Sequence, residues 1–415
     1  MLLNYIKIAW KVLLRHPFYT FITLFGISLT LTVLMVLTSF LDHLIGSHYP
    51  ETKRDRTLYV MQMHLQDSSR TSSSNGPMSF KFLTDYAKSL KTAERVTITT
   101  FINSSNAYVG SQKIKLNTKF TDADFWQVTS FEFLEGKPYN EQNIANGDNV
   151  AVITDDFKKH YFENSSEPVV GKDVEIENIH YKVIGVVKAS PVTRPFTYAD
   201  VFFPYTAPKS NYQGTGMRGG YVAMILGKDK ADLPAIQEEF QSHIDRIPLP
   251  IIQDGTKFAV MDVKSVPYLE NFLGSILNGN PGMKAIFFGI IFFVLFMLMG
   301  LPAINLVNIN VSRIMERASE IGIRKAFGAP IRTLMWQFIV ENIFITFIGG
   351  AIALILTFIV IHLINTSGMI AYADLTINLY VFVISIVVCL LFGLLSGVLP
   401  ALRMSKLNIA EALKS

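Results

Sequence analysis

Side chains that could carry out chemistry are few in this sequence, and they are scattered. Eight histidines occur, and the closest pair, His43 and His48, lies beside Asp42. These three residues could bind a metal ion, but polar surface residues on an extension of a helix are the commoner explanation. Patterns typical of zinc proteases, serine hydrolases and cysteine-ligated metals do not occur. We therefore expect neither enzymatic activity nor a metal site in this chain.

A glycine-rich stretch at 214–219 matches the pattern G-x-G-x-x-G. A dinucleotide site requires a strand before this pattern and a helix that opens after it. Here a Pro-, Ser- and Asn-containing loop precedes the glycines and a strand-like run follows, so we interpret the stretch as a flexible loop. The pattern G-x-x-x-x-G-K-[ST] does not occur either. No cofactor is expected in this chain.

Long apolar stretches without charge are the dominant feature of the chain. About 20 apolar residues are needed to cross the ~30 Å hydrocarbon core of a bilayer. Four stretches reach this length, which predicts transmembrane helices at 17–41, 285–309, 338–364 and 377–402. The first is much longer than the apolar part of a signal peptide and no cleavage site follows, so we interpret it as an uncleaved anchor. Residues 1–16 have the pattern of a basic amphipathic helix on the inner membrane surface.

Basic residues are concentrated at the flanks of these apolar stretches. Residues 42–284 contain 26 basic and 28 acidic residues, and the rest of the chain contains 11 and 5. Because Lys and Arg accumulate on the cytoplasmic side, both termini, the tail 403–415 and the segment 310–337 should be cytoplasmic. Residues 42–284 should then lie outside the membrane. The excess of basic residues is a feature of the membrane flanks, and no nucleic-acid partner is expected.

The external region alternates between strand-like and helix-like patterns. A β-α-β unit is followed by a β-rich insertion between residues near 140 and 210, and strand, helix and strand patterns then return. The fold class is therefore an α-helical membrane protein with four transmembrane helices and a large extracytoplasmic α+β domain. The single cysteine, Cys389, lies in the last predicted span, so no disulfide can form within the chain and the domain must be held by its own core.

A short, highly charged segment at 310–330 lies between the second and third predicted spans. Glu320 and Arg324 are four residues apart with the acid first, which stabilises a helix. Gly328 followed by Pro330 predicts the end of that helix. Such a helix could be an ordinary linker on the membrane surface or a docking element for a cytoplasmic protein. The residues alone favour neither.

Two residues in the predicted spans could have special roles. Pro302 would kink the second span close to its cytoplasmic end and so redirect the chain into the charged segment. Glu341 opens the third span, and carboxylates within membranes are often functional. Pairing with Arg332, or extension to the membrane interface, is the favoured interpretation over a role in transport.

Several motifs together resemble the MacB/FtsX-type ABC transporter permeases. The stretch 316–329 is similar to the hallmark of this family, and 400–413 resembles its C-terminal ending. Residues 126–138 and the stretches 169–172 and 181–187 are similar to segments of its periplasmic domain. The order of one span, a large external domain and three further spans matches as well.

The resemblance implies a division of labour along the chain. Residues 57–140 and 211–266 would form an α/β subdomain, 141–210 a β-rich inserted subdomain, and 310–330 a coupling helix seated on a separate ATP-binding subunit. The residues implied to couple the two subunits are Glu316, Arg317, Glu320, Ile321, Gly322, Arg324, Lys325 and Gly328. The permease would form a dimer, with itself or with a homologous permease, bound to two ATPase subunits. ATP binding would move the external domain, which is called mechanotransmission. MacB itself carries a fused N-terminal ATPase, whereas only about 16 residues precede the first span here, so the ATPase is expected from another gene.

The cargo is not specified by these residues. In a bacterial inner membrane, efflux of small hydrophobic compounds or peptides is the leading expectation, with a periplasmic adaptor and an outer-membrane channel as possible partners. Lipoprotein release and control of a cell-wall hydrolase are alternatives within the family. A membrane-anchored ligand sensor belongs to a different class, and a neighbouring gene for a kinase, as opposed to a P-loop ATPase, would favour it.

Overall fold

The computed structural model describes residues 17–391 with gaps, together with a few positions between 7 and 15. The gaps are 70, 110–111, 164–166, 254–255, 277–284, 301–330 and 369–371, and the single positions 295, 298, 299, 373, 388 and 389. The chain divides into two compact units. Unit 1 consists of Met1–Asp42, Pro281–Met369 and Leu375–Ser415, and unit 2 of His43–Asn280 and Ile370–Asp374.

Unit 1 is built from long apolar helices. Helix α2, Pro17–Ile45, contributes all but its last residues, and helix α11 covers Ile331–Ser367. Among the described residues these two contain the stretches that are long and apolar enough to cross a membrane, and Ala285–Val294 forms a shorter apolar helix. The predicted first and third spans coincide with α2 and α11. Parts of the second and fourth predicted spans lie outside the described residues, so a total of four spans stays a prediction.

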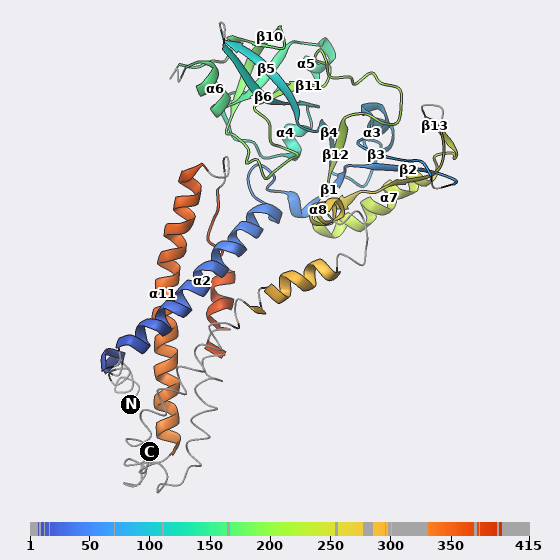
Figure 1. The fold of residues 1–415 in the computed structure, drawn as a ribbon. Helices are drawn as coiled ribbons and strands as arrows, with labels where there is room; N and C mark the ends of the chain where they lie inside the picture. Colours follow the sequence, from blue (N-terminus) through green and yellow to red (C-terminus); the bar gives the residue numbers. More distant parts are fainter. Residues whose placement is uncertain are drawn as a thin grey trace. The chain divides into compact units, whose positions relative to one another are not determined.

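Small residues allow α2 and α11 to approach closely where they cross (Figure 1). A Cβ atom added to Gly349 would lie only 2.8 Å from Cγ2 of Ile27. The hydroxyl of Thr32 reaches the carbonyl oxygen of Ala353 at 3.3 Å, and Ile345 is fully buried in the same contact. Lipid tails are as apolar as these side chains, so close packing and hydrogen bonds have to stabilise the pair.

The first part of unit 2 is an antiparallel sheet covered by helices. Its neighbouring strands are β4 (Arg95–Thr100), β12 (Tyr221–Leu226), β1 (Thr57–Val60) and β15 (Val266–Pro267). Helices α3 (Phe80–Tyr86) and α7 (Leu233–Asp245) share a hydrophobic core with β1, β4 and β12. All six residues of β12 are buried, because its other side packs against Tyr59, Phe196 and Tyr268. Strand β12 is therefore the central strand of this region.

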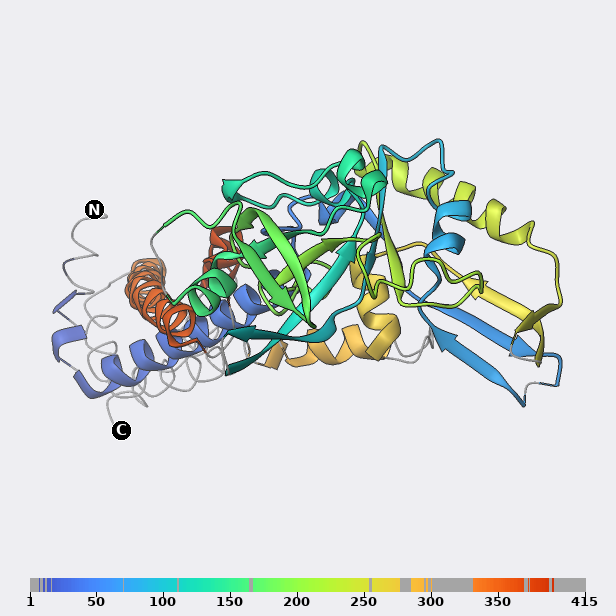
Figure 2. The ribbon, with the colours of Figure 1, turned by 90° about the horizontal axis from the view of Figure 1, so that it is seen from above.

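A second, smaller sheet extends from the same region. It contains β13 (Ile251–Gln253), β14 (Thr256–Val263), β2 (Met63–Asp67) and β3 (Ser73–Gly76) in this order. Figure 2 shows its strands beside helix α7. Met63 and Leu65 on β2 are fully buried and join the core that α7 covers. The two sheets and both helices thus form one α/β subdomain.

The remaining strands close into a six-stranded barrel. The circuit is β11 (Val201–Pro204), β8 (Val150–Thr154), β10 (Ile179–Val187), β9 (Asp173–Ile176), β5 (Asn103–Val109) and β6 (Gln112–Thr121). Parallel pairing of β11 with β6 completes it. Side chains fill the interior, among them Phe120, Val183 and Phe203. Strand β7 (Phe133–Gly136) pairs with β10, and the short helices α4 (Phe125–Val128), α5 (Glu141–Asn146) and α6 (Asp155–Tyr161) lie in the connections.

The barrel takes strands from both sides of residue 141, where the sequence pattern placed the start of the β-rich insertion. Strands β5 and β6 lie within the stretch 57–140 that was assigned to the α/β subdomain, yet they pair with β9 and β11. Strand β6 also contacts β4 through the pair Thr99 and Thr121. It therefore belongs to both subdomains. Strand pairing over such separations leaves no local pattern in the sequence, which explains the difference.

Candidate functional site

The residues predicted to couple the permease to an ATPase lie outside the described part of the structure. All of them, from Glu316 to Gly328, fall within the gap 301–330, as does the predicted kink at Pro302. Their role in coupling therefore stays a prediction.

Glu341 lies on α11, where its side chain is buried at 3% exposure next to Asn342 at 5%. The hydroxyl of the nearby Thr346 donates to the carbonyl oxygen of Asn342 at 2.8 Å, which continues this polar strip along an apolar helix. The predicted partner Arg332 is on the same helix, but its side chain is outside the described residues. The pairing thus stays a prediction.

His43 and His48 lie close together at the end of α2. No group of three His, Cys, Asp or Glu side chains suited to a metal ion occurs among the described residues. The rings of His43 and His48 stack with centroids 6.1 Å apart, and Nε2 of His43 lies 3.1 Å from the hydroxyl of Thr193. His43 is only 2% exposed, so the interpretation as a surface residue is wrong for this histidine. It is buried because the domain encloses the end of α2.

The glycine-rich stretch 214–219 is a loop, as predicted, and the strand β12 follows it. A Cβ atom on Gly219 would lie 2.8 Å from Cα of Ser79. This glycine therefore allows two backbone segments to pack closely.

A buried group of polar side chains surrounds the end of α2, and we call it the arginine cluster. Its members are Glu51, Arg54, Tyr59, Arg194, Thr197 and Tyr268. They come from distant parts of unit 2: the residues before η1, η1 itself (Arg54–Arg56), strand β1, the loop before β11 and helix α8 (Tyr268–Ile276). No motif in the sequence marks any of them.

Glu51 is the acceptor at the centre of the arginine cluster. Nη2 of Arg54 lies 2.8 Å from its Oε2, and the two side chains are 2% and 1% exposed. Tyr59 donates to the same oxygen at 3.2 Å, and Thr197 donates to Oε1 at 2.9 Å. A buried carboxylate is tolerated only when it is paired and hydrogen-bonded in this way. Glu51 therefore compensates one of the two positive charges that Arg54 and Arg194 bring into the interior.

Both arginines donate to carbonyl oxygens where α2 ends. Nη1 of Arg54 donates to the oxygen of Leu44 at 2.6 Å, and Nη2 of Arg194 donates to those of His43 and Gly46, each at 3.1 Å. The last carbonyls of a helix have no partner within the helix and carry a partial negative charge, so cations stabilise this end. The guanidinium groups thus bind the last turn of α2 to the folded domain.

The pKa values of the two arginines in the cluster reflect their burial and the charges beside them. Burial opposes ionisation of Arg54, but the adjacent Glu51 carboxylate outweighs it and raises the pKa of Arg54 above its usual value. Burial, followed by repulsion from Arg54, lowers the pKa of Arg194 to about 10. Both groups stay charged near neutral pH. The guanidinium of Arg54 also lies 3.7 Å from the ring centroid of Tyr268, at the start of α8.

A lysine is completely buried nearby, on strand β6. Lys119 is 0% exposed, and its Nζ donates to the carbonyl oxygen of Thr100 at 2.7 Å. Burial lowers its pKa to about 7, and only the charge of Glu51 acts in the opposite direction. Lys119 is therefore a titratable group in the core close to physiological pH.

A segment that follows α11 also contacts the folded domain within unit 2. Tyr372 donates to Oδ2 of Asp156, on helix α6, at 2.5 Å. The carboxylate of Asp156 also lies 3.3 Å from Nδ1 of His160. Unit 2 thus includes the last residues of α2 and also the segment 370–374, which follows α11 in the chain.

Comparisons with known proteins show which family the chain belongs to. Residues 20–243 match the MacB-like periplasmic core domain, and residues 289–409 match the FtsX-like permease C-terminal domain. The chain belongs to the MacB/FtsX-type ABC transporter permeases. Within this permease, the periplasmic core domain begins in α2 and ends in α7, and it includes the barrel and the arginine cluster except Tyr268.

The relatives of this permease differ in length. An ABC transporter permease of Bacillus subtilis, YknZ, is 23% identical over 100% of this chain and 99% of its own length. The macrolide export ATP-binding/permease protein MacB of Campylobacter jejuni is 27% identical over 67% of this chain, but the match covers only 41% of MacB. The periplasmic region of MacB from Actinobacillus actinomycetemcomitans, solved by crystallography, aligns with 52% of this chain at 18% identity and a TM-score of 0.36.

Proposed function

We propose that this permease couples ATP hydrolysis by a separate ATPase subunit to motion of its periplasmic domain. The observation that carries this proposal is the arginine cluster. The end of an apolar, span-length helix is hydrogen-bonded by Arg54 and Arg194 into the core of that domain. A movement of α2 along or about its axis would reach the domain through these charged contacts without a flexible linker in between.

The wider assembly belongs to the same proposal, and membership of the family supports it. The permease would have four spans in a bacterial inner membrane, with both termini in the cytoplasm. It would act as a homodimer or as a heterodimer with a related permease, bound to two ATPase subunits that hold ATP and Mg²⁺. The segment 310–330 would contact the ATPase. Efflux of small hydrophobic compounds or peptides is the proposed outcome, and an adaptor with an outer-membrane channel would extend the path.

The first test identifies the partner. The full-length permease is purified in mild detergent from its native cell, and the co-purifying chains are identified by mass spectrometry. We expect an ATP-binding subunit in stoichiometric amount. A preparation that retains other membrane partners but contains no ATP-binding chain would contradict the proposal.

A second test addresses the coupling segment. Glu320→Lys and Gly322→Trp should abolish stimulation of the ATPase by the permease, because charge reversal and bulk disturb a helix seated in a groove. Glu238→Lys is a matched control, since Glu238 is exposed on α7 in the periplasmic domain. Proteolysis should show an intact periplasmic domain in all three variants. Full ATPase activity in both segment variants would argue against docking there.

A further inference from the structure

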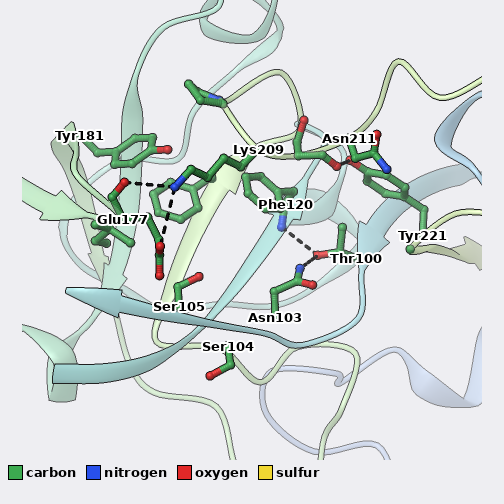
Figure 3. A pocket seen from close by; sticks show the side chains of 15 residues that line it. Thr100, Asn103, Ser104, Ser105, Phe120, Glu177, Tyr181, Lys209, Asn211 and Tyr221 are labelled. Atoms are coloured by element: carbon green, nitrogen blue, oxygen red, sulfur yellow. Dashed lines mark hydrogen bonds and ion pairs between the residues drawn. The ribbon is translucent and has the colours of Figure 1, made fainter. Parts of the chain in front are cut away.

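A cavity of about 430 Å³ opens at one end of the β-barrel (Figure 3). Its floor consists of the barrel side chains Phe120, Tyr181 and Phe203, which are at most 8% exposed. The rim is polar and contains Asn103, Ser105, Glu177, Lys209 and Asn211. Cavities of this size hold small ligands, and mouths of barrels are common binding sites. Nothing in the coupling role requires this cavity.

One edge of β5 is left open beside this cavity. Strand β9 pairs with β5 at a single position, where Ala107 lies opposite Ile176. The chain then turns away at Glu177 and Asn178, which both have positive φ (52° and 64°). In the described part of the chain, no strand continues along residues 103–105 on the side of β9.

The backbone of Ser104 faces this open edge. The neighbouring Asn106 directs its groups toward β9, since its N–H donates to Oε1 of Glu177 at 2.7 Å and its oxygen accepts from the N–H of Glu177 at 2.9 Å. Alternate residues of a strand direct their N–H and C=O groups to the same edge. Ser104 therefore presents its N–H and C=O on the same side as Asn106. Figure 3 shows its side chain on the other face from Asn103 and Ser105, so Ser104 lines the cavity with its backbone.

Charges at the rim are balanced. Nζ of Lys209 donates to the carbonyl oxygen of Glu177 at 3.1 Å and lies 3.7 Å from its Oε2. The carboxylate is held further by the side-chain amide of Asn106 at 2.9 Å. One ammonium and one carboxylate thus neutralise each other, and the rest of the rim consists of hydroxyl and amide groups. A ligand of high net charge has no complement here.

We propose that the cavity binds an extended, uncharged peptide segment that pairs with β5 at Ser104. One apolar or aromatic side chain of the peptide rests on the floor formed by Phe120, Tyr181 and Phe203. Pairing with an open strand edge provides main-chain hydrogen bonds, and a pocket for alternate side chains provides selectivity. A purely apolar compound would cover the backbone groups of Ser104 without hydrogen bonds, which costs free energy. A peptide can form hydrogen bonds with the open edge of β5 and also place an apolar side chain on the floor of the cavity.

The experiment uses the full-length permease in lipid nanodiscs without ATP or ATPase. The probe is a short, acetylated peptide amide in which threonine alternates with leucine, labelled with an uncharged fluorophore, and binding is followed by fluorescence anisotropy. Two further probes have the same sequence with N-methyl groups on alternate backbone nitrogens. One carries them on the odd-numbered residues and the other on the even-numbered residues, which gives the two registers. Because each lost hydrogen bond weakens binding by about 1 kcal/mol, we expect the register that blocks pairing to bind about fivefold more weakly.

Two substitutions at one position separate the backbone from the side chain. Ser104→Pro removes the N–H at the open edge, where proline is tolerated because no strand accepts from it. It should weaken peptide binding about fivefold, whereas Ser104→Ala should stay within about twofold of the wild type. Should Ser104→Pro unfold, as seen by its melting temperature, the N-methylated probes on the wild-type permease decide the question alone.

Three outcomes would overturn the proposal. The first is no binding of the parent peptide at millimolar concentration. The second is equal binding of the parent and both N-methylated peptides, and the third is displacement of a bound apolar dye by small hydrophobic compounds but not by the peptide. Because the measurement involves neither nucleotide nor ATPase, failure of peptide binding leaves the coupling role intact. An uncoupled permease can in turn still bind the peptide.

Discussion

The arginine cluster and the barrel mouth, both in unit 2, differ in how far their polar groups are buried and hydrogen-bonded within the protein. In the cluster, the central carboxylate of Glu51 has protein donors on both oxygens, and the side chains are almost inaccessible to solvent. At the barrel mouth, Lys209 and Asn211 are exposed, and the backbone of Ser104 faces an open edge. The carboxylate that holds two parts of one chain together has its partners within the protein, although Nε and Nη1 of Arg194 are buried without a hydrogen-bond partner among the described residues. A site for a ligand leaves hydrogen bonds to be made by the ligand.

The difference has an energetic basis. Loss of one partner from a buried ion pair leaves an uncompensated charge in a low-dielectric interior, which is strongly destabilising. Exposed ion pairs such as Lys209 with Glu177 contribute little because water and salt screen them. Substitutions in the cluster should therefore change stability, and substitutions at the mouth should change binding. The following variants test this contrast.

The largest effect is expected for Glu51→Gln. Arg54 and Arg194 would keep their charges in the core without a carboxylate, so the free energy of unfolding should fall by about 3–5 kcal/mol. Thermal unfolding of the full chain in detergent measures this change. Glu177→Gln at the barrel mouth is the matched control and should cost less than about 1 kcal/mol. Similar losses in both variants would remove the contrast between the two sites.

Lys119→Met should change the pH dependence of stability. The folded state lowers the pKa of Lys119 to about 7 from 10.5, so the unfolded chain binds more protons between these values. Stability of the wild type should therefore rise with pH from about 7 toward 10, by up to about 1.4 kcal/mol per pH unit. Below pH 7 the lysine is charged in both states, and its burial cost is fully present.

The variant lacks this group, so its unfolding midpoint should not show the rise and should exceed that of the wild type at about pH 6. Midpoints measured at several pH values, with Lys115→Met as a surface control, decide the matter. Parallel profiles for the wild type and Lys119→Met would show that Lys119 is not desolvated.

Arg194→Met should loosen the last turn of α2. The carbonyl oxygens of His43 and Gly46 would lose their donor, which corresponds to about 1–3 kcal/mol of local stability. Hydrogen exchange measured by mass spectrometry should become faster in the peptide that covers residues 40–47. Lys81→Met, at an exposed pair with Asp85, should leave this peptide unchanged. Unchanged exchange in Arg194→Met would mean that the cluster does not hold the helix end.

The smallest effect is expected for Tyr372→Phe. It removes one hydrogen bond to Asp156, worth about 0.5–1.5 kcal/mol, from a half-exposed position. Faster hydrogen exchange in α6 would show the loss, and Tyr108→Phe on β5 is the control. No change in α6 would indicate that the segment 370–374 is not held by this contact.

Elements with a strong local pattern were predictable from the sequence. Helix α7 and strand β6 have such patterns. Apolar spacing at a period of about 3.6 or 2 residues specifies such elements by itself. Strand β5 was not predicted, because its first residues, Asn103 to Asn106, are polar residues that are depleted in strands. Pairing with β6 over seven positions outweighs that propensity.

Neither site could be assembled from the sequence. The only local signal of the arginine cluster is the spacing of Glu51 and Arg54, which is unremarkable for a surface helix. Arg194 gave no signal, although it is completely buried.

By itself, the sequence determined the apolar segments α2 and α11 and the membership of the MacB/FtsX-type permeases. Transfer of a segment into a membrane depends on the composition of that segment alone, and the family motifs are equally local. Tertiary structure decided the closure of the barrel, the open edge of β5 and the arginine cluster. These features depend on strand register and on contacts such as Glu51 with Thr197, which are 146 residues apart. Such contacts arise only when the whole domain has folded, because burial of a carboxylate costs free energy unless partners from distant segments are in place.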